Sequence, residues 1–209
     1  MLALAIALGI DASCQAGLVI EAPNITVAPG SSGSFDVLIT STGGSFDVAS
    51  DTVELSLTGL SGVTFTGVSI DTVTPYIYGA LSATTAGSTF TFSTFPGTQF
   101  EVFDFILSLG ATTISSGDVF GLVNVQYSVA ANATPGASGT LAFGADTSLA
   151  DAAGNNVDFT APNGSITISS SAAVPEPSTL VTATLALLGG FLLIRSKRCC
   201  DVRVPIQTQ

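Results

Sequence analysis

Apolar and polar residues alternate with a period of two along most of the chain, from residue 24 to residue 169. In SFDVLIT, for example, the alternation places Phe35, Val37 and Ile39 on one face of the segment. The same pattern recurs in TVELSLTG, STFTFSTF, DVFGLVNVQYSV, GTLAFG, NVDFT and GSITIS. Successive side chains of a β-strand point to opposite sides, and these short runs are rich in β-branched or aromatic residues and bounded by turn formers. Since no segment before Leu180 repeats with the period of a helix, the sequence predicts an all-β sandwich of jelly-roll type with about nine strands.

Acidic residues within the expected strands do not form a catalytic pair. The segment FEVFDFILSL is expected to bury one face, made of Phe103, Phe105, Leu107 and Leu109. Glu101 and Asp104 then lie on opposite faces of that strand, and Asp51 and Glu54 are interpreted as solvated charges at a sheet edge, so no two carboxylates are placed as in a glycosidase. Residues 1–194 also contain no His, Lys or Arg, which removes the usual bases and oxyanion donors. The sequence therefore predicts a protein that is not an enzyme and needs no cofactor.

The charges are distributed very unevenly along the chain. There are 15 acidic and four basic residues, which gives a net charge of −11 at pH 7. Nucleic-acid binding requires cations that displace the counterions of the phosphates, so nucleic acid is excluded as a partner of residues 1–194. About 150 residues lie between the two ends, enough for one domain with its own core. The cysteines Cys14, Cys199 and Cys200 lie near the termini, so the middle domain is expected to have no disulfide.

The first sixteen residues, MLALAIALGIDASCQA, have the composition of a secretory signal peptide. An apolar run from Leu2 to Ile10 precedes small residues and Ala16, after which we expect cleavage. No basic residue precedes the apolar run, which suggests a translation start further upstream. Cys14 is not interpreted as a lipidation site, because Asp11 stands three residues before it, where an aliphatic residue is expected.

Near the other end, Leu180–Ile194 is an uncharged and almost entirely apolar run of fifteen residues, followed at once by RSKR. A helix that is apolar all round and ends in cations fits a membrane span with its basic end in the cytoplasm. The expected organisation is therefore a signal peptide at 1–16, an ectodomain at 17–170, a linker at 171–179, a transmembrane helix at 180–194 and a basic tail at 195–209.

Three features of this C-terminal region occur in a fixed order: Pro175-Glu176-Pro177, the apolar run, and the cations Arg195, Lys197 and Arg198. Together they resemble a PEP-CTERM sorting signal. The resemblance implies transient tethering by a single span and processing by an exosortase, a membrane-embedded enzyme of Gram-negative-type bacteria that make exopolysaccharide. The two prolines also keep the backbone extended and outside the helix, within reach of a protease. The tail CCDVRVPIQTQ departs from the family, whose signals usually end near the basic cluster.

The order of segments in the middle domain resembles a cohesin-like domain of the carbohydrate-binding-domain superfamily. The matching stretches are VAPGSSGSFDVLI, VELSLTGLSGVTFTGVSI, GDVFGLVNVQYSVAANATPGASG and NGSITI, with turns at Pro29-Gly30 and Pro135-Gly136. The family includes dockerin-binding modules of cellulosomes. The resemblance therefore implies a β-sandwich ectodomain and, as one alternative, a module that binds carbohydrate or protein.

One acidic stretch, GADTSLADAAGNNVDF, is a candidate calcium site. It places Asp146, Asp151, Asn155 and Asp158 around a turn, and calcium prefers oxygen ligands of this kind. The spacing matches neither an EF-hand nor a nonapeptide repeat, and Asp and Asn also supply turn geometry without a metal. The turn interpretation is favoured, and calcium is kept as an alternative.

Sugar binding by stacking usually requires exposed flat rings. The chain has no Trp, but Tyr76 and Tyr78 in TPYIYG share an expected strand face and are candidate ligand or sugar contacts, with a place in the core as the alternative. Threonines in two expected strands resemble the ladders of ice-binding proteins. Because they form no regular repeat, we interpret them as ordinary outward-facing residues.

The sequence thus predicts an exported, non-enzymatic protein with a structural or adhesive role at the cell surface or in an extracellular polysaccharide matrix. The expected partners are the exosortase, the membrane and, outside the cell, polysaccharide or a surface protein. A carbohydrate- or protein-binding module, with or without calcium, is the main alternative, and ice binding is a remote one.

Overall fold

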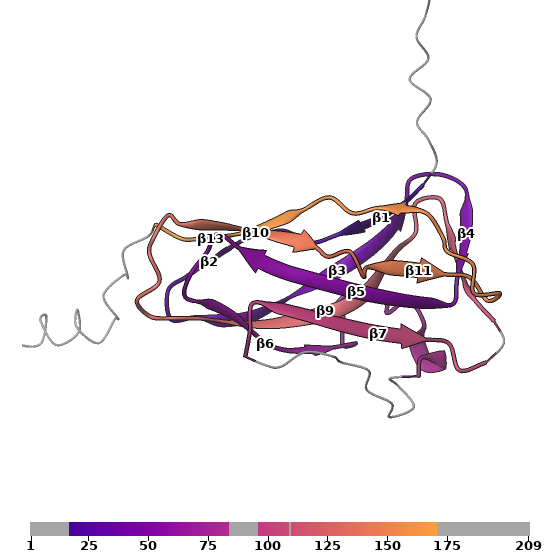
Figure 1. Ribbon diagram of the computed structural model, residues 1–209, viewed down its shortest axis with the longest axis horizontal. Coiled ribbons are helices and arrows are strands. Elements are labelled where there is room, and N and C mark those ends of the chain that lie inside the picture. Colours follow the sequence, from indigo (N-terminus) through magenta and orange to yellow (C-terminus); the bar gives the residue numbers. More distant parts are fainter. Residues whose placement is uncertain (1–16, 84–95, 109, 171–209) are drawn as a thin grey trace, which may run out of the picture. The chain divides into compact units, whose positions relative to one another are not determined.

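The computed structural model describes residues 17–83, 96–108 and 110–170, which contain thirteen strands (Figure 1). One sheet has the order β12-β1-β3-β9-β6, with bounds Phe159–Thr160, Leu18–Glu21, Ser32–Ser41, Val119–Val129 and Val63–Ser69. We call it the first sheet. The second sheet has the order β11-β5-β10-β13-β2, with bounds Ser148–Ala150, Ser50–Thr58, Ser138–Phe143, Gly164–Ile168 and Asn24–Val27. In the second sheet β7 (Gln99–Phe105) also pairs with β5, and a separate ribbon joins β4 (Ser45–Val48) to β8 (Thr112–Ser115).

Several expected features lie outside the described residues. These are the signal peptide at 1–16, the Pro175–Pro177 motif, the apolar run at 180–194 and the cations Arg195, Lys197 and Arg198. Within the described ranges, no helix is long and apolar enough to cross a membrane.

The chain changes sheets at two proline-containing segments. After β1 the chain passes through Ala22 and Pro23 into β2, which pairs in parallel with β13 of the second sheet. After β12 it passes through Pro162 into β13 itself. Proline has no N–H to donate to a ladder, so a strand is readily interrupted where it occurs. The two crossings pack closely, because a Cβ at Gly164 would lie 2.5 Å from the Ala22 carbonyl oxygen.

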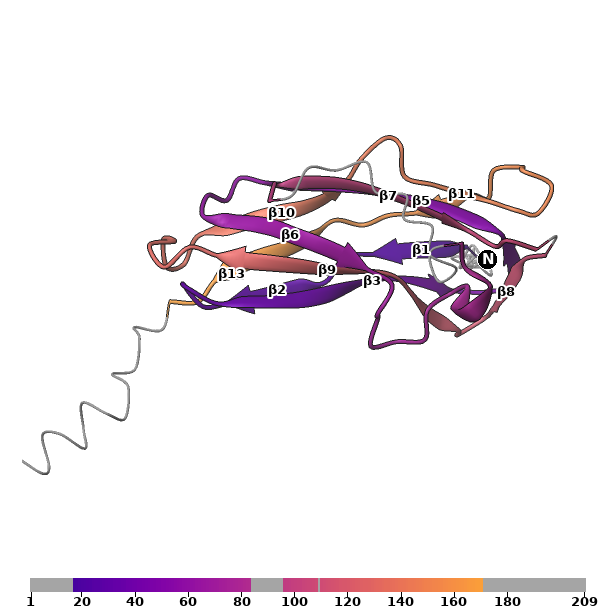
Figure 2. The same ribbon diagram turned by 90° about the horizontal axis from the view of Figure 1, so that it is seen from below.

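The core lies between the two sheets, which form separate layers with β5 and β7 in one and β3 and β9 in the other (Figure 2). The alternation expected in SFDVLIT is confirmed, since Phe35, Val37 and Ile39 are all buried. Phe65 stands at the centre, with its ring 6.3 Å from that of Phe35 and 5.5 Å from that of Phe100, both edge to face. Residues of both sheets therefore meet in one aromatic contact that holds the layers together.

The orientation expected for FEVFDFILSL is wrong. In β7 the side that faces the core carries Phe100 and Asp104, followed by Ile106 just beyond the strand, and all three are buried. Phe103 and Phe105 lie on the outer side, and Leu107 is 56% exposed, while Leu109 is outside the described residues. Pairing with β5 sets this orientation: Leu55 lies opposite Phe100 and Val53 opposite Val102. Paired residues lie on the same side of a sheet. The residues of β7 that face the core are therefore those paired with the core-facing residues of β5.

Candidate functional site

Tyr76 and Tyr78 lie in an irregular segment that follows β6 and packs against β9. The Ile77 N–H donates to the Gly121 carbonyl (3.0 Å), and the Gly121 N–H donates back to the Pro75 carbonyl (2.9 Å). The two tyrosine rings meet edge to face, with centroids 5.9 Å apart. Because Tyr78 is only 3% exposed, the pair does not form the exposed platform that stacking on a sugar requires.

Asp104 connects this segment to the second sheet. Its Oδ2 accepts hydrogen bonds from the Tyr76 and Ser82 hydroxyls, and its Oδ1 accepts one from the Phe105 N–H at 2.8 Å. Asp104 is 2% exposed. These hydrogen bonds satisfy both oxygens of a buried carboxyl group, and they fix the segment of Tyr76 and Ser82 against β7.

Asp51 lies directly opposite Asp104 in the β5–β7 pairing and is 3% exposed. The expectation that Asp51 is a solvated edge charge is therefore wrong. Asp51, Val53, Leu55 and Leu57 are alternate residues of β5, and all four side chains face the core. The alternation in the sequence therefore indicates that Asp51 is buried. Glu54 is out of phase with them and only partly buried.

The protonation of this cluster follows from burial. Burial raises the pKa of Asp51 to about 8; the facing Tyr78 hydroxyl lowers that pKa, whereas the charge of Asp104 raises it further. Asp51 Oδ1 and the Tyr78 hydroxyl oxygen are buried and, within the described part of the chain, neither has a hydrogen-bond partner of standard geometry. Burial also raises the pKa of Tyr76 and Tyr78 well above the usual value, so both keep their protons. At neutral pH Asp51 is therefore largely uncharged.

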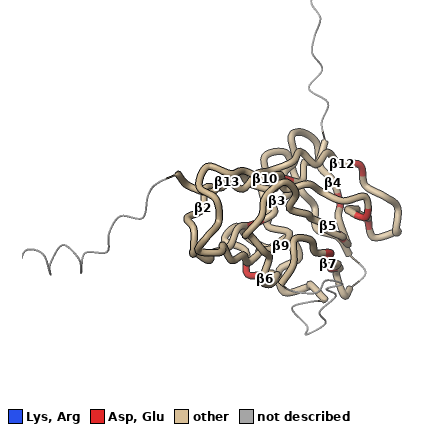
Figure 3. The backbone as a smooth tube through the Cα atoms, turned by 60° about the vertical axis from the view of Figure 1, so that its left-hand side comes forward, with Lys and Arg blue, Asp and Glu red and all other residues tan. Residues whose placement is uncertain are grey.

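These residues form a buried polar cluster with a structural role. Its two acids, two tyrosines and one serine hold the segment after β6 against β5 and β7. Figure 3 shows no Lys or Arg in the described chain, so no basic side chain there faces these acids. Asp51, Asp104, Tyr78 and Ser82 are all buried, and the arrangement therefore stabilises the fold without presenting a carboxylate to a ligand.

Two of the candidate calcium residues, Asp151 and Asn155, are in contact, and they bond to each other within the turn. Asp151 Oδ1 accepts the N–H groups of Ala153 (2.9 Å) and Asn155 (2.8 Å), and its Oδ2 accepts the Asn155 side-chain amide (2.9 Å). These bonds, the Asn155 side chain first, lower the pKa of Asp151. The Asp146 N–H instead donates to Glu54, and Asp158 lines a separate hollow. Within the described residues no three acidic, His or Cys side chains form a metal group, and the Asp151 oxygens serve the turn.

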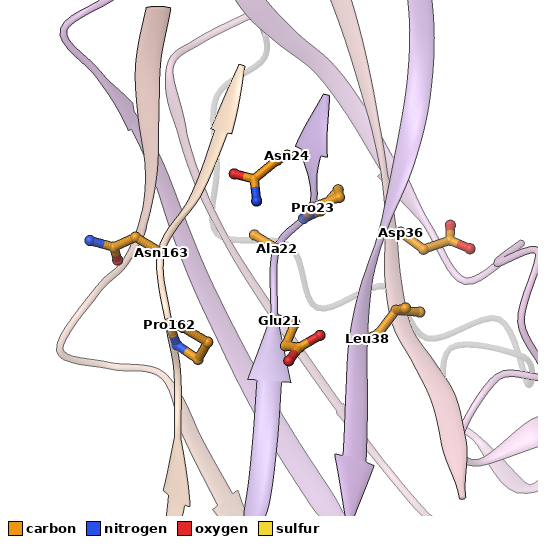
Figure 4. A pocket seen from close by; sticks show the side chains of 8 residues that line it. All are labelled: Glu21, Ala22, Pro23, Asn24, Asp36, Leu38, Pro162 and Asn163. Carbon is orange, nitrogen blue, oxygen red and sulfur yellow. The ribbon is translucent and has the colours of Figure 1, made fainter. Parts of the chain in front are cut away.

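The surface of the described chain is hollowed on the first sheet. A hollow of about 290 Å³ lies near the two sheet crossings. Figure 4 shows its lining side chains, among which the carboxylates of Glu21 and Asp36 do not point toward one another. Asp36 already accepts hydrogen bonds from the Asn124 side chain and the Val73 N–H, both at 2.7 Å. A shallow hollow of about 420 Å³ lies over β3, β6 and β9 and is lined mainly by hydroxyl and amide side chains. A third, of about 390 Å³, lies beside β1 and β12.

No family model matches the sequence, and no curated protein matches it. Several solved structures of cohesins match the fold. The solution structure of CaCohA2 from Clostridium acetobutylicum has a TM-score of 0.56 at 19% identity and covers 75% of this chain and 93% of that one. The seventh ScaB type I cohesin from Pseudobacteroides cellulosolvens has a TM-score of 0.55 at 13% identity, with 77% and 97% covered. The sixth cohesin of Acetivibrio cellulolyticus scaffoldin B has a TM-score of 0.53 at 14% identity, with 73% and 99% covered.

At sequence identities this low, the similarity to these structures shows the fold alone. The described residues form a cohesin-like β-sandwich, and this expectation from the sequence is confirmed.

Proposed function

We propose that the sandwich is a protein-binding module of an exported surface protein and that it carries out no catalysis. Cohesins of the same fold were solved in complex with dockerins, among them the scaffoldin B cohesin and the OlpA cohesin of Clostridium thermocellum. A module of this kind, carried at the cell surface or in the matrix, would hold a second protein there. This proposal takes up the protein-binding module that the sequence analysis gives as the alternative to a structural or adhesive role.

One feature of the second sheet carries the proposal. On the outer side of β7 the rings of Phe103 and Phe105 stack, with centroids 5.5 Å apart, and both are half-buried. Two small polar residues of β5 lie opposite them: Thr52 opposite Phe103 and Ser50 opposite Phe105. Aromatic residues beside small polar residues on the outer side of a sheet have the composition of an interface hot spot.

The charge beside the aromatic pair indicates what kind of partner would fit. Glu54 and Glu101 lie opposite each other in the β5–β7 pairing, two positions from Phe103. Residues 17–170 contain no Lys, Arg or His. A partner surface with an apolar centre and basic residues around it would complement this face, and its association should be faster at low ionic strength.

A binding experiment tests the proposed face. The exported form would be immobilised and exposed separately to surface proteins and to polysaccharide of the producing bacterium, with and without calcium. We expect a defined protein to be retained, and the double substitution Phe103→Ala/Phe105→Ala to weaken its retention about 10-fold or more. The matched control is Gln126→Ala, because Gln126 is exposed on β9 of the other sheet.

Two results would contradict the proposed face. Equal loss of retention in the control and the double variant would show that the phenylalanines are not the contact. Retention of polysaccharide alone would favour the carbohydrate-binding alternative. Circular dichroism of each variant separates lost contacts from lost folding.

We also propose the route to the surface: cleavage after Ala16, tethering through 180–194, and exosortase processing near Pro175–Pro177. The order of these segments in the sequence supports this route. Mass spectrometry of the exported protein should find Gly17 at its start and a C-terminus near the Pro-Glu-Pro motif. Recovery of intact Gln209 outside the cell would contradict it. Replacing Arg195, Lys197 and Arg198 by Gln should release unprocessed protein, since these cations are expected to stop transfer.

A further inference from the structure

The buried acids Asp51 and Asp104 lie at directly opposed positions of β5 and β7, where antiparallel pairing brings the Cβ atoms to about 5 Å. We call them the carboxyl pair. Both side chains are on the core side, 3% and 2% exposed. Burial, and after it the charge of Asp104, raises the pKa of Asp51 to about 8. Two carboxylates held this close in a protein core repel each other, so the pair is stable with one proton and unstable with none.

No opposite charge compensates the carboxyl pair within the described part of the chain. The other titratable groups that face the pair are the hydroxyls of Tyr76 and Tyr78. On the other side of β5, β11 places the apolar Leu149 opposite Asp51. Residues 17–170 contain no Lys, Arg or His. The remaining acids of these two strands, on their outer side, are Glu54 and Glu101.

The segment that covers the pair, residues 70–83, is attached more weakly than a strand. It is irregular apart from a short 3-10 turn at Gly79–Leu81. Its backbone meets β7 where the Ala83 N–H donates to the Phe105 carbonyl at 2.8 Å, and it meets β9 where the Ile77 N–H donates to the Gly121 carbonyl. A segment held by few backbone hydrogen bonds opens at a lower free energy than a continuous ladder.

The carboxyl pair supplies the side-chain attachment of this segment. Asp104 Oδ2 accepts the hydroxyls of Tyr76 and Ser82, and the Tyr78 hydroxyl faces Asp51. A second negative charge in the pair is therefore hydrated only when these side chains move away. Ionisation of the pair and opening of the segment are thus coupled equilibria.

We propose that the proton retained by the carboxyl pair holds residues 70–83 against β5 and β7, and that its loss as the pH rises releases this segment. Release would also remove the Ala83 N–H from the Phe105 carbonyl, at the end of the strand that carries the proposed binding face. Binding at that face would then weaken as the pH rises. This last consequence rests on the proposed function, whereas the release itself does not.

Native-state hydrogen exchange of the exported form, followed by nuclear magnetic resonance, tests the release. The amides of Ile77 and Ala83 report on the segment, and the Val129 amide, which donates to the Ser31 carbonyl of the first sheet, is the reference. From a pKa of 3.8 in the open state and about 8 in the closed state, the protection factors of the segment should fall about 50-fold between pH 6 and pH 8. Low concentrations of urea should leave them unchanged, because a local opening exposes little surface, and should lower the protection of Val129.

One substitution assigns the effect to the pair. In Asp51→Asn, which cannot ionise, the protection of Ile77 and Ala83 should change less than about 3-fold between pH 6 and pH 8. Asp146→Asn is the matched control, because it removes an exposed carboxylate and should keep the 50-fold fall.

Infrared spectroscopy of the original protein needs no variant and keeps the test decisive if Asp51→Asn folds poorly. Ordinary carboxyl groups are ionised at pH 6. A band of a protonated carboxyl group should therefore be present at pH 6 and disappear by about pH 9.

Several outcomes would overturn the inference. These are a protection of the segment that does not depend on pH, an equal fall in Asp51→Asn, or no protonated carboxyl group at pH 6. A urea dependence equal to that of Val129 would mean that the whole sandwich unfolds instead. Loss of the pH response on addition of calcium or sodium ions would show that the pair holds a cation in place of the proton.

The link to the binding face is tested separately. Retention of the partner should be weaker at pH 8 than at pH 6 in the original protein and should change less in Asp51→Asn. Constant retention while the segment opens would contradict this link alone. Failure of the proposed function is recognised by a different result, unchanged retention in Phe103→Ala/Phe105→Ala.

Discussion

Replacing Asp51 by asparagine tests whether a buried carboxyl controls the stability of the sandwich. Burial is the main reason that the pKa of Asp51 rises from 3.8 to about 8. The folded protein therefore keeps a proton that the unfolded chain releases above about pH 4. Since Asp51 is protonated in the folded state and ionised in the unfolded state between about pH 4 and pH 8, its contribution to stability is fully present below this window and is lost as the pH rises through it.

The size of the effect follows from the pKa. A rise from 3.8 to about 8 corresponds to about 6 kcal/mol of unfolding free energy lost across the whole window. Between pH 6 and pH 8 the loss should be about 2 kcal/mol, because the slope flattens as the pH approaches the folded pKa. In this narrower interval the chain has no His, and ordinary carboxyl groups are already ionised at pH 6. The α-amino group also titrates there, but it is common to the original protein and Asp51→Asn, so the difference between their slopes reports Asp51.

Urea unfolding of a chain spanning residues 17–170 at pH 6, 7 and 8 measures the effect. Asp51→Asn retains the shape of the side chain but cannot ionise, so its unfolding free energy should be nearly constant over this range. At pH 8 the variant should be at least as stable as the original protein. Asp146→Asn is the control, because it removes an exposed carboxylate and should leave the slope intact. A flat profile in the original protein, or an unchanged slope in Asp51→Asn, would refute the reasoning.

Three further substitutions test the packing and the turn. Phe65→Ala removes a fully buried ring between two others and should cost about 3–5 kcal/mol in urea unfolding. Gly164→Ala places a Cβ 2.5 Å from the Ala22 oxygen and should cost about 1–3 kcal/mol; an unchanged melting temperature would mean that the crossing is loose. Asp151→Ala removes the acceptor of the Asn155 N–H, and the lowered pKa of Asp151 means that its stabilisation exists above about pH 4 and disappears as the pH falls. The melting temperatures of that variant and the original protein should therefore approach each other as the pH falls below about 4, and a constant difference would exclude a contribution from the charge.

The class of the fold and the location of many core residues follow from the sequence alone. The period-two alternation of SFDVLIT identifies a strand and its buried side, because one phase is apolar and the other mostly polar. The export and sorting segments are likewise read from local composition, and they remain predictions. The sequence places Tyr76 and Tyr78 near each other, and the structure brings their rings together in an irregular segment, with Tyr78 buried.

Tertiary structure decided the orientation of β7 and the burial of Asp51. In FEVFDFILSL both phases are apolar, so hydrophobicity cannot choose between Phe103 and Phe100 as the inward residue. The choice comes from the register with β5, and the same register brings Asp51 and Asp104 together. Phe46 and Phe159 lie far apart in the chain, and only the pairing of β12 with β1 and of β4 with β8 places them around one hollow. Alternation is a property of a few neighbouring residues, whereas register and convergence depend on which distant strands meet.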